Sequence, residues 1–598
     1  MFSPASLRWL LGLAGLFVLV FALAALSGPG RIDTVDAQTR YEVARSLVEH
    51  GDSIIRDKGT WFNVYEGRDG DRYSLYRFPQ SGLGVAAIWA ADLTAPTATI
   101  GAAREMRRHF FFLLTSAFCG AILALTYALW FRYLGHSPAA SLAWALAGFV
   151  CTPSWFYSST TFDDIVGTTG IVVAVAAAWI GRHRAPLVGA SIAGIALAWA
   201  VNSKQPLGIF GLVVLAAMYR PELPLRKQLL PWLVTLFWLG AGCVACVLYE
   251  RYKFPPGTTD PNAEFVRHYG DIYTSNPLPG LSSFALSTSC GVFFYCPALY
   301  LALRGWWTWR KQERVLCWSV AAASALFMLF LSFVTFFKGE HGWGPRYLTP
   351  MFAIWWVFVP SAVAQVRVFV MRGVLALGIV IQILGLAVDP TRLFLTTPVQ
   401  LDYFLYDPWL TFHPSLSHLL QRPREIVEVV SNHDPEPEFA PAPLTTHAGG
   451  LHEVSAYLAA QMVATSFAPG AGAANPVAHV PVNLAMSGQA TMASLPNMYQ
   501  QMGRRYHIYN SLRPWWISQR TLPKENRPVD HARALTFLLA LCGLGTAMMI
   551  LPIPWSRRNW ESMGPGASGV GRQETSPRGP PSTVHAPRSM PPEEVRLA

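Results

Sequence analysis

The stretch LRWLLGLAGLFVLVFALAAL, residues 7–26, is followed after four residues by the charged stretch RIDTVDAQTRY, residues 31–41. A helix of about 20 apolar residues is long enough to cross the roughly 30 Å hydrocarbon core of a bilayer. Charged side chains are costly inside that core, so those found beside it are paired with one another or used in chemistry. Together the two stretches predict a membrane-spanning helix whose far end leads into a chemically equipped loop.

The rest of the chain extends this pattern. Of its 598 residues, 52% are hydrophobic and 14% are charged, whereas the charged fraction of a soluble protein is roughly 25%. We therefore predict an all-α polytopic membrane protein, a bundle of about twelve transmembrane helices with outward-facing loops. The predicted spans are Leu7–Leu26, His109–Trp130, Pro138–Tyr157, Ile165–Ile180, Leu187–Val201, Leu207–Met218, Leu230–Tyr249, Phe284–Leu303, Val315–Phe337, Tyr347–Val363, Phe369–Val388 and Ala534–Leu551.

The basic residues set the predicted orientation. They gather in alternate short loops, which the positive-inside rule assigns to the cytoplasm. Topology thus accounts for the net charge of +11, and no nucleic-acid partner is expected. We predict a multi-pass protein of the cytoplasmic (inner) membrane with both termini inside. The residues that carry this bias are Arg132, Arg182, Arg184, Arg226, Lys227, Arg304, Arg310, Lys311, Arg314, Arg367, Arg372, Arg557 and Arg558.

One segment tests this count. Phe78–Asp92 is apolar but about 15 residues long, too short to span comfortably, so we predict that it is re-entrant or interfacial. Arg104, Arg107 and Arg108 then lie on the outer side, against the usual bias of basic residues.

The regions outside the spans differ in character. In the first outer loop, Asp36–His50 has the periodicity of an amphipathic helix, and a hairpin is predicted around the turn Gly67–Asp71. The tail is rich in Pro, Gly, Ser and Arg, a composition typical of disorder. The predicted organisation is a transmembrane region (1–388, with the first outer loop at 27–79), an extracytoplasmic region of unknown fold (389–533), a last transmembrane helix (534–555) and a disordered cytoplasmic tail (556–598).

Asp33 and Asp36 lie just beyond the first span. A carboxylate at this position can take a proton from a substrate or hold a metal ion. Aspartate is also a favoured N-cap, so either residue could simply begin the predicted helix. Both cannot be the same cap, which leaves one of them for chemistry.

Asp163 and Asp164 follow the third predicted span as an adjacent acid pair. Such a pair could bind a divalent cation or assist a base, and no other cofactor is indicated. The alternative is a helix start, where acids complement the positive end of the helix dipole.

The third constellation is the stretch EHGWGPRY, which runs from Glu340 and His341 to Arg346 and Tyr347. The planar arginine fork suits a phosphate group, and glycines let the backbone approach a ligand closely. Trp, Tyr and Arg are also ordinary anchors at a membrane interface. Lys204, on the same predicted side, could add a second positive charge for a phosphate or merely extend to the interface.

These motifs resemble a known family in their order and common sidedness. The segments RYEVARSLVEHG (residues 40–51), YSLYRFPQSG (73–82) and GWGPRYL (342–348) are similar to those of integral-membrane glycosyltransferases of the GT-C superfamily, of the aminoarabinose-transferase and protein-mannosyltransferase type. The resemblance covers roughly residues 1–388, which would then be a GT-C type catalytic region.

The resemblance implies an outward active site at the first outer loop and a polyprenyl-phosphate sugar donor. It implies that Asp36 is the acidic residue of the loop that takes part in catalysis, with Asp33 as the second candidate, because Arg40 and Tyr41 follow Asp36 closely. Many family members carry an adjacent acid pair there, whereas this chain has Ala37 after Asp36. The substrate-binding residues that follow from the three constellations are Arg40, Tyr41, Lys204, Glu340, His341, Arg346 and Tyr347.

The sequence therefore predicts a membrane glycosyltransferase that moves a sugar from a polyprenyl-phosphate donor to a lipid, glycan or protein acceptor, with membrane lipids as its surroundings. The alternative is a non-enzymatic transporter or lipid flippase. A transporter would carry ionisable residues near mid-span and interrupted helices in matching halves. Here the charges gather at the ends of the spans.

Overall fold

The computed structural model describes most of the chain. The described residues are 4–58, 60, 63–94, 102–258, 260–261, 263, 273, 276–334, 336–339, 342–390, 392–393, 411–412, 414–431, 511–519 and 527–551. The predicted disordered tail, residues 556–598, lies outside this part of the chain.

The described chain is helical apart from one small hairpin, which confirms the all-α membrane prediction. Eight of its helices are long and apolar enough to cross a bilayer. They are α1 (Pro4–Ser27), α4 (Ala102–Tyr133), α7 (Asp164–Arg184), α8 (Pro186–Ser203), α10 (Leu225–Lys253), α15 (Arg314–Ser332), α17 (Val368–Ala387) and α25 (His531–Ile550).

Shorter helices occupy the other four predicted spans, so the count of twelve stays a prediction. The bundle is completed by α5 (Pro138–Val150), α6 (Ser154–Ser158), η2 (Gln205–Phe210), α9 (Gly211–Met218), α12 (Leu278–Leu286), α13 (Val292–Tyr295), α14 (Ala298–Trp309), η3 (Arg346–Leu348), α16 (Thr349–Trp355) and η4 (Trp356–Ala362). Beyond α17 come η6 (Pro414–Leu416), α20 (His418–Val430) and α24 (Trp515–Ser518).

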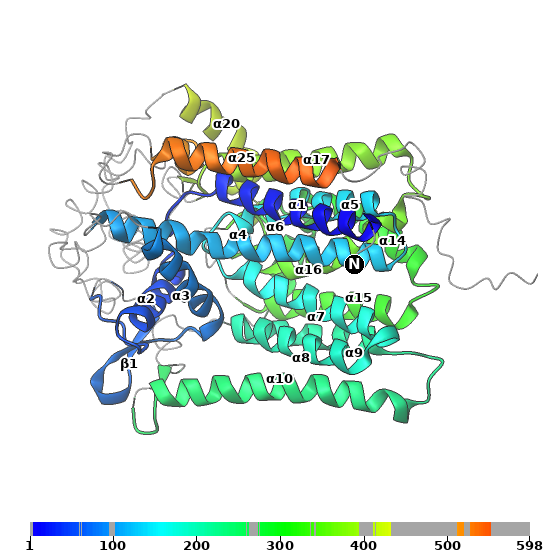
Figure 1. The fold of residues 1–598 in the computed structure, drawn as a ribbon, viewed down its shortest axis with the longest axis horizontal. Helices are drawn as coiled ribbons and strands as arrows, with labels where there is room; N and C mark the ends of the chain where they lie inside the picture. Colours follow the sequence, from blue (N-terminus) through cyan, green and yellow to red (C-terminus); the bar gives the residue numbers. More distant parts are fainter. Residues whose placement is uncertain are drawn as a thin grey trace, which may run out of the picture.

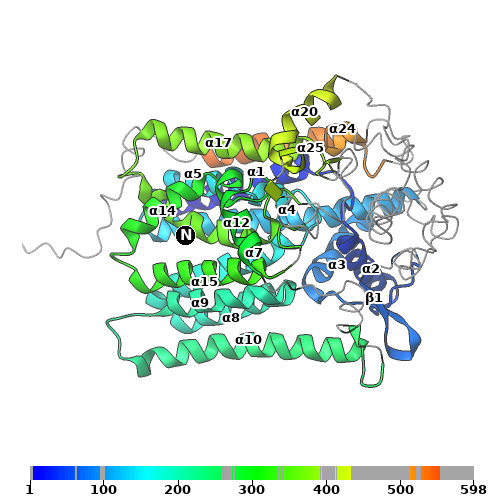
Figure 2. The same ribbon diagram turned by 180° about the vertical axis from the view of Figure 1, so that it is seen from behind.

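The long helices run side by side along one direction (Figure 1). The elements of the first loop, labelled α2, α3 and β1, project together at one end of this bundle. The view from behind shows α12 and α15 on the other side of the bundle, with α20 and α24 near the end that carries the first loop (Figure 2). The first loop and the segments that carry α20 and α24 therefore lie near the same end of the bundle.

The basic loops meet at the opposite end. Arg182, in the last turn of α7, pairs with Glu313 before α15 and donates to the carbonyl of Tyr219 after α9 at 3.2 Å. Arg184 lies over the ring of Tyr133 at the end of α4, 5.0 Å from its centroid. These contacts bring together loops that the charge pattern assigns to one side, as the predicted alternation requires.

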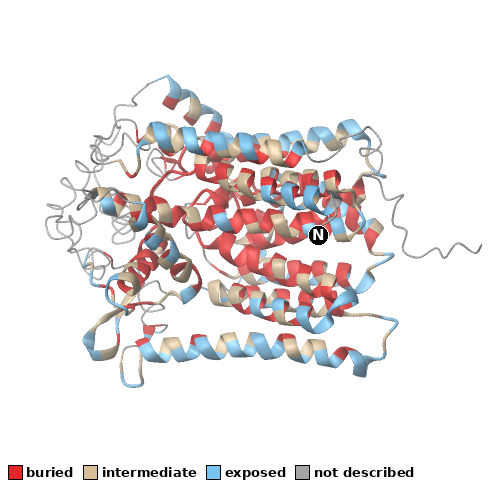
Figure 3. Cartoon of the chain, viewed as in Figure 1, coloured by how far each residue is buried: buried red, intermediate tan, exposed pale blue. Residues whose placement is uncertain are grey.

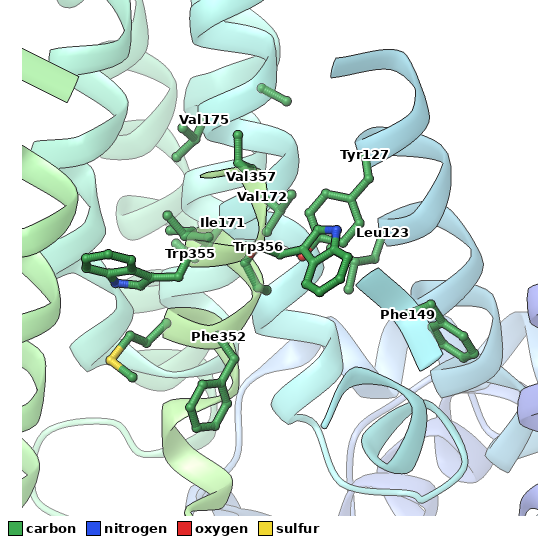
Figure 4. Close-up of a cluster of buried hydrophobic side chains, with 14 of the residues drawn as sticks. Leu123, Tyr127, Phe149, Ile171, Val172, Val175, Phe352, Trp355, Trp356 and Val357 are labelled. Carbon is green, nitrogen blue, oxygen red and sulfur yellow. The ribbon is translucent and has the colours of Figure 1, made fainter. Parts of the chain in front are cut away.

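The core lies where α4, α5, α7, α16 and η4 come together (Figure 4). Large side chains dominate it, and some of them hydrogen-bond to the backbone of a neighbouring helix. Tyr127 donates to the carbonyl of Ala353 at 2.7 Å, and Trp356 donates from its indole to the carbonyl of Trp144 at 3.0 Å. Exposed side chains lie along the outer helices, above all α10 and α25 (Figure 3). In a bilayer, these apolar outer faces are in contact with lipid.

The first and last long helices cross closely. A Cβ on Gly15 of α1 would lie 2.6 Å from the carbonyl oxygen of Gly545 in α25, so only glycine fits this crossing. Close approach at small residues is the usual way for helices to associate in lipid, where dispersion replaces the hydrophobic effect. The pair fixes both ends of the described chain in one bundle.

The first loop folds as predicted, apart from its cap. Helix α2 (Val35–Glu49) begins after Thr34, whose side chain accepts a hydrogen bond from the amide of Ala37 at 3.1 Å. The alternative that Asp33 or Asp36 serves as the cap of this helix is therefore wrong. Threonine is also a good N-cap, and its hydroxyl leaves both carboxylates for other partners.

The predicted hairpin and short apolar helix are present. Strands β1 (Val64–Glu66) and β2 (Arg72–Ser74) pair antiparallel with Tyr65 opposite Tyr73, and η1 (Arg68–Gly70) lies in the turn between them. The apolar segment forms α3 (Phe78–Leu93), which packs on α2 and α4 at the first-loop end and is too short to span.

Of the three arginines that depart from the charge bias, Arg104 and Arg108 have acidic partners, and Arg107 donates to the carbonyls of Ala91 and Thr94. Arg108 donates to Glu49 of α2 and at 2.7 Å to Asp92 of α3, and Arg104 also pairs with Asp92 at 2.9 Å. Their departure from the charge bias is thus balanced locally, because α4 is held to α2 and α3 by these ion pairs.

The topology can be tested with single cysteines in a protein that lacks its eight native cysteines. His50, Ala185 and Ser431 are exposed, and substitution by Cys allows labelling with a membrane-impermeant thiol reagent on intact cells. We expect labelling at His50→Cys and Ser431→Cys but not at Ala185→Cys, because the basic end should face the cytoplasm. Labelling of Ala185→Cys alone would reverse the orientation of the bundle.

Candidate functional site

A cluster of buried charges lies at the first-loop end of the bundle. It joins Arg40 of α2, Asp163 and Asp164 at the start of α7, Lys204 between α8 and η2, and Arg346 at the start of η3. Arg40, Asp163, Asp164 and Arg346 are each at most 6% exposed. The structure thus brings together five of the predicted site residues from four separate segments.

The contacts of this ion cluster are short. Arg40 donates from Nη2 to Oδ2 of Asp163 at 2.9 Å. The ammonium of Lys204 bonds to Asp164 and lies 3.3 Å from Oδ1 of Asp163. Nε of Arg346 lies 3.5 Å from Oδ2 of Asp164. Each carboxylate therefore faces two cations, and Lys204 is shared between them.

Helix α7 positions the two acids. Asp163 is its N-cap residue and Asp164 its first residue, where the helix dipole favours negative charge. The two interpretations of this pair from the sequence therefore apply together: the acids begin a helix, and they also hold the cations of the cluster.

The described members of the cluster carry a net positive charge, since three cations face two carboxylates. Burial acts to raise the pKa of Asp163, but the charges of Arg40, Lys204 and Arg346 outweigh it and lower that pKa. Burial acts to lower the pKa of Lys204, and the two aspartates reverse this effect and raise it. Both groups are thus charged at neutral pH.

Aromatic rings line the cations. The guanidinium of Arg346 lies 4.3 Å from the ring centroid of Phe162, and it donates to the hydroxyl of Tyr347 at 2.8 Å. Lys204 lies over the same Tyr347 ring at 4.7 Å. Such contacts hold a cation in a partly desolvated place, where it attracts an anion more strongly than it would in water.

Asp36 is joined to the cluster through Tyr76. The hydroxyl of Tyr76 donates to Oδ1 of Asp36 and receives a hydrogen bond from Nδ2 of Asn63 at 2.6 Å. Arg40 lies over the face of the Tyr76 ring, 3.9 Å from its centroid. Burial raises the pKa of Tyr76 well above its ordinary value, so this hydroxyl stays a donor. Asp36 itself is half-buried.

Asp33 has different surroundings. Its carboxylate accepts hydrogen bonds from the amide of Thr161, at 2.9 Å, and from the hydroxyl of the same residue, and it lies 3.4 Å from Nη2 of Arg513. Burial raises the pKa of Asp33 although Arg513 and Thr161 act to lower it. Asp33 therefore fastens the loop before Asp163, and it lies outside the ion cluster.

Tyr41 also lies apart from the ion cluster. Its hydroxyl donates to Glu105 of α4, and its ring packs edge-on against His109 with centroids 4.6 Å apart. Glu42 and Arg45 belong to the same group of charges, 2.7 Å apart. These residues connect another face of α2 to α4.

Two predicted residues, Glu340 and His341, lie outside the described residues. Within the described part, no group of three or more His, Cys, Asp and Glu side chains has the arrangement of a metal site. Asp163 and Asp164 are already engaged by Arg40, Lys204 and Arg346, so a metal ion would have to displace one of these cations.

A cavity of about 590 Å³ opens beside the cluster. Its walls include Tyr76, which holds Asp36, and Ser203 and Gln205, which flank Lys204. Arg77 and Arg251 also line it. Glu250 and Asp260 line it as well, and the cavity reaches the chain neighbours of Lys204 and the hydrogen-bond partner of Asp36 rather than these two side chains themselves.

No role for Tyr76, Arg77 or Arg513 follows from the sequence pattern. Tyr76 belongs to a quoted motif, but its contact with Asp36 spans 40 positions. Arg513 is 480 positions from Asp33 and lies in a region whose pattern names no fold. No local signal could have found either contact.

No protein-family model and no curated protein sequence matches the chain. Among solved structures, the chain is similar to ArnT from Cupriavidus metallidurans in the apo state, at 13% identity and a TM-score of 0.43, with 84% of this chain and 78% of that chain covered. It is also similar to ArnT from the same organism bound to undecaprenyl phosphate, at 15% identity and a TM-score of 0.37, with 83% and 77% covered.

Glu42 provides a test of the group of side chains that connects α2 to α4, to which Tyr41, Arg45 and Glu105 also belong. Burial raises its pKa from 4.5 to about 8, although Arg45 acts to lower it. The folded protein therefore holds a proton that the unfolded chain releases near its ordinary pKa, and stability falls as the pH rises from about 4.5 to 8. Glu42→Gln should raise the free energy of unfolding by on the order of 1–2 kcal/mol at pH 8, and the stability of the variant should depend less on pH.

The measurement is thermal unfolding in detergent across that pH range. Glu66→Gln, at an exposed position of β1, is the matched control and should leave the curve unchanged. A lower melting temperature for Glu42→Gln at pH 8 would show that the ionised carboxylate stabilises the fold.

Proposed function

We propose that this protein is a glycosyltransferase of GT-C type that moves a sugar from a polyprenyl-phosphate donor to a lipid, glycan or protein acceptor at the outer face of the cytoplasmic membrane. The observation that carries the proposal is the buried ion cluster, in whose described part three cations face two carboxylates, joined through Tyr76 to Asp36. The sequence resemblance of the same segments to GT-C glycosyltransferases supports it.

Asp36 is the proposed base. The acceptor oxygen or nitrogen attacks the anomeric carbon of the donor, the bond from this carbon to the phosphate oxygen breaks, and Asp36 takes the acceptor proton. Tyr76 holds one side of the Asp36 carboxylate through a hydrogen bond, and Asn63 in turn donates to the hydroxyl of Tyr76. Asp33, whose carboxylate is already taken by Thr161 and Arg513, has a positioning role in this scheme.

The cations stabilise the leaving phosphate. As the glycosidic bond breaks, negative charge develops on the phosphate, and preorganised positive groups lower the energy of that state. Arg346 and Lys204 are proposed to contact the phosphate. Arg40 pairs with Asp163 and is not proposed to contact the phosphate itself. The aspartates keep these side chains in place before substrate arrives.

The cavity is the proposed place of the transferred sugar. It borders Tyr76, which bonds to the proposed base, and Ser203 and Gln205, which flank Lys204. Arg77 and Arg251 offer donors for the hydroxyl groups of the sugar or for the phosphate.

Lipid analysis tests the proposal as a whole. Mass spectrometry of lipid-linked sugars and surface glycans, with and without the gene, should show one polyprenyl-phosphate sugar accumulating and one glycan losing a residue. Unchanged lipid-linked sugars and glycans, with altered movement of a lipid across the membrane, would instead favour a flippase.

Asp36→Asn should abolish transfer while the protein still accumulates in the membrane. Asn keeps the size of Asp and can still accept from Tyr76, but it cannot act as a general base. Loss of general base catalysis lowers the rate about 10²- to 10⁴-fold. The measurement is the same glycan analysis in cells that express the variant.

Asp69→Asn, at an exposed position in the same loop, is the matched control and should be fully active. Full activity in Asp36→Asn with loss in Asp33→Asn would transfer the role of base to Asp33. Full activity in both variants would remove the carboxylate mechanism.

Arg346→Lys tests the phosphate contact. Lysine keeps the charge but loses the planar fork and its two parallel hydrogen bonds. Losing a hydrogen bond to a charged group costs about 1.5–3 kcal/mol, which is about tenfold to a hundredfold in catalytic efficiency. Kinetics against varied donor measure the effect, and Arg226→Lys at the basic end is the control. Wild-type efficiency of Arg346→Lys would rule out the assigned contact.

A further inference from the structure

We propose that Lys253, the last residue of α10, is a positioning residue that holds Tyr76 against Asp36. The inference rests on the proposed role of Asp36. Lys253 is 0% exposed. Its ammonium donates to the backbone carbonyls of Ser74, at 2.7 Å, and Tyr76, at 3.2 Å, and lies 3.1 Å from Oε1 of Glu250.

A buried ammonium requires an explanation, because it loses its hydration unless oxygens replace the water. Lysine has three N–H donors, and here three oxygen atoms face them. Two of these oxygens belong to the backbone on either side of Leu75, directly after β2 ends at Ser74. The amide of Leu75 still bonds to the carbonyl of Asn63 across the hairpin, at 2.8 Å, whereas the carbonyls of Ser74 and Tyr76 on either side of it accept from Lys253.

The turn that Lys253 holds sets the position of the Tyr76 ring. The amide of Tyr76 also donates to Oγ of Ser74 at 2.9 Å, so the backbone of this residue is fixed through both its N–H and its carbonyl. The ring then carries Arg40 on its face and directs its hydroxyl at Asp36. Lys253 acts on Asp36 only through Tyr76.

The end of α10 is closely fitted to the hairpin. The ring of Tyr73 packs edge-on against Tyr252 and Phe254, with centroids 6.4 and 6.1 Å apart. A Cβ on Gly67 would lie 2.2 Å from the carbonyl oxygen of Lys253, so no larger residue fits there. Over the rest of its length α10 is mostly uncovered, since 11% of its apolar stretch of 18 residues is buried. Its hairpin end is therefore where this helix is anchored to the site.

The first experiment measures the position of Tyr76 without any substrate. The residue is replaced by 3-fluorotyrosine, and its fluorine NMR signal is recorded in detergent. Lys253→Met keeps an unbranched apolar stem but has no donor, so we expect the signal to move relative to wild type. Lys227→Met, an exposed lysine at the other end of α10, should leave the signal in place. An unmoved signal in Lys253→Met would overturn the inference.

The second experiment is a double-mutant cycle. Membranes from cells that lack the gene supply donor and acceptor, and the rate of transfer is measured after purified protein is added. Loss of charge-assisted hydrogen bonds should lower the rate of Lys253→Met about tenfold to a hundredfold. In a Tyr76→Phe background, the same substitution should cost less than about twofold, because the route to Asp36 is already broken. Equal losses in both backgrounds would overturn the positioning role.

The two experiments separate the inference from the proposed function. If the wild-type protein transfers no sugar, the proposed function fails, and the fluorine signal still decides whether Lys253 positions Tyr76. If Lys253→Met does not accumulate, Lys253→Gln replaces it, since its amide can still donate to one carbonyl. Its fluorine signal should still move relative to that of the wild type, because contacts of the ammonium are lost. An unmoved signal would again overturn the inference.

Discussion

Two buried carboxylates at the start of α7 are the constraint on which the first-loop end of the bundle depends. Removing one partner of a buried ion pair is strongly destabilising, by about 3–5 kcal/mol, because the other charge is left uncompensated. The burial of Asp163 and Asp164 as carboxylates therefore requires compensating cations, which Arg40, Lys204 and Arg346 supply. This requirement fixes α2, the junction of α8 with η2, and the start of η3 against α7. The long helices could pack in lipid without it, whereas the arrangement at this end could not.

The two aspartates of the first loop, Asp33 and Asp36, differ in their hydrogen-bond partners and therefore in what each can do. Thr161 and Arg513 occupy the carboxylate of Asp33 and fasten the chain just before Asp163, so Asp33 serves the architecture. Asp36, in the first turn of α2, is held from one side by Tyr76, which lines a cavity. Because Thr34 caps that helix, the Asp36 carboxylate is not consumed by the backbone. A threonine thus makes a neighbouring acid available for chemistry.

Periodicity and composition predicted what depends on short-range order. The long spans, α2 and the hairpin each follow from spacing within about one helical turn or one strand pair. The charge pattern predicted which loops share an end, and the contacts of Arg182 with Glu313 and Tyr219 agree with it. The pattern could not tell Thr34 from its acidic neighbours as the cap, since all are good caps. It could not place Tyr41 against Glu105 or Arg513 against Asp33, since these contacts depend on tertiary packing. The short helices α5, α14 and α16 left the number of spans open, because length is the signal for a span.

The charge of the ion cluster also bears on catalysis. A polyprenyl-phosphate sugar is a phosphodiester with one negative charge, and the polyprenyl phosphate that leaves is a monoester with about −1.5 to −2 at neutral pH. The described residues of the cluster leave one positive charge in excess, which balances the donor but not the product-like state. Since only interactions that strengthen toward the transition state accelerate a reaction, cations pre-paired with acids are well matched to this chemistry. The growing charge on the phosphate can draw Lys204 and Arg346 away from their aspartates, whereas a donor with a single charge competes with these carboxylates less well. In the proposed reaction, the aspartates would therefore limit ground-state binding, and the cations would favour the step in which the phosphate leaves.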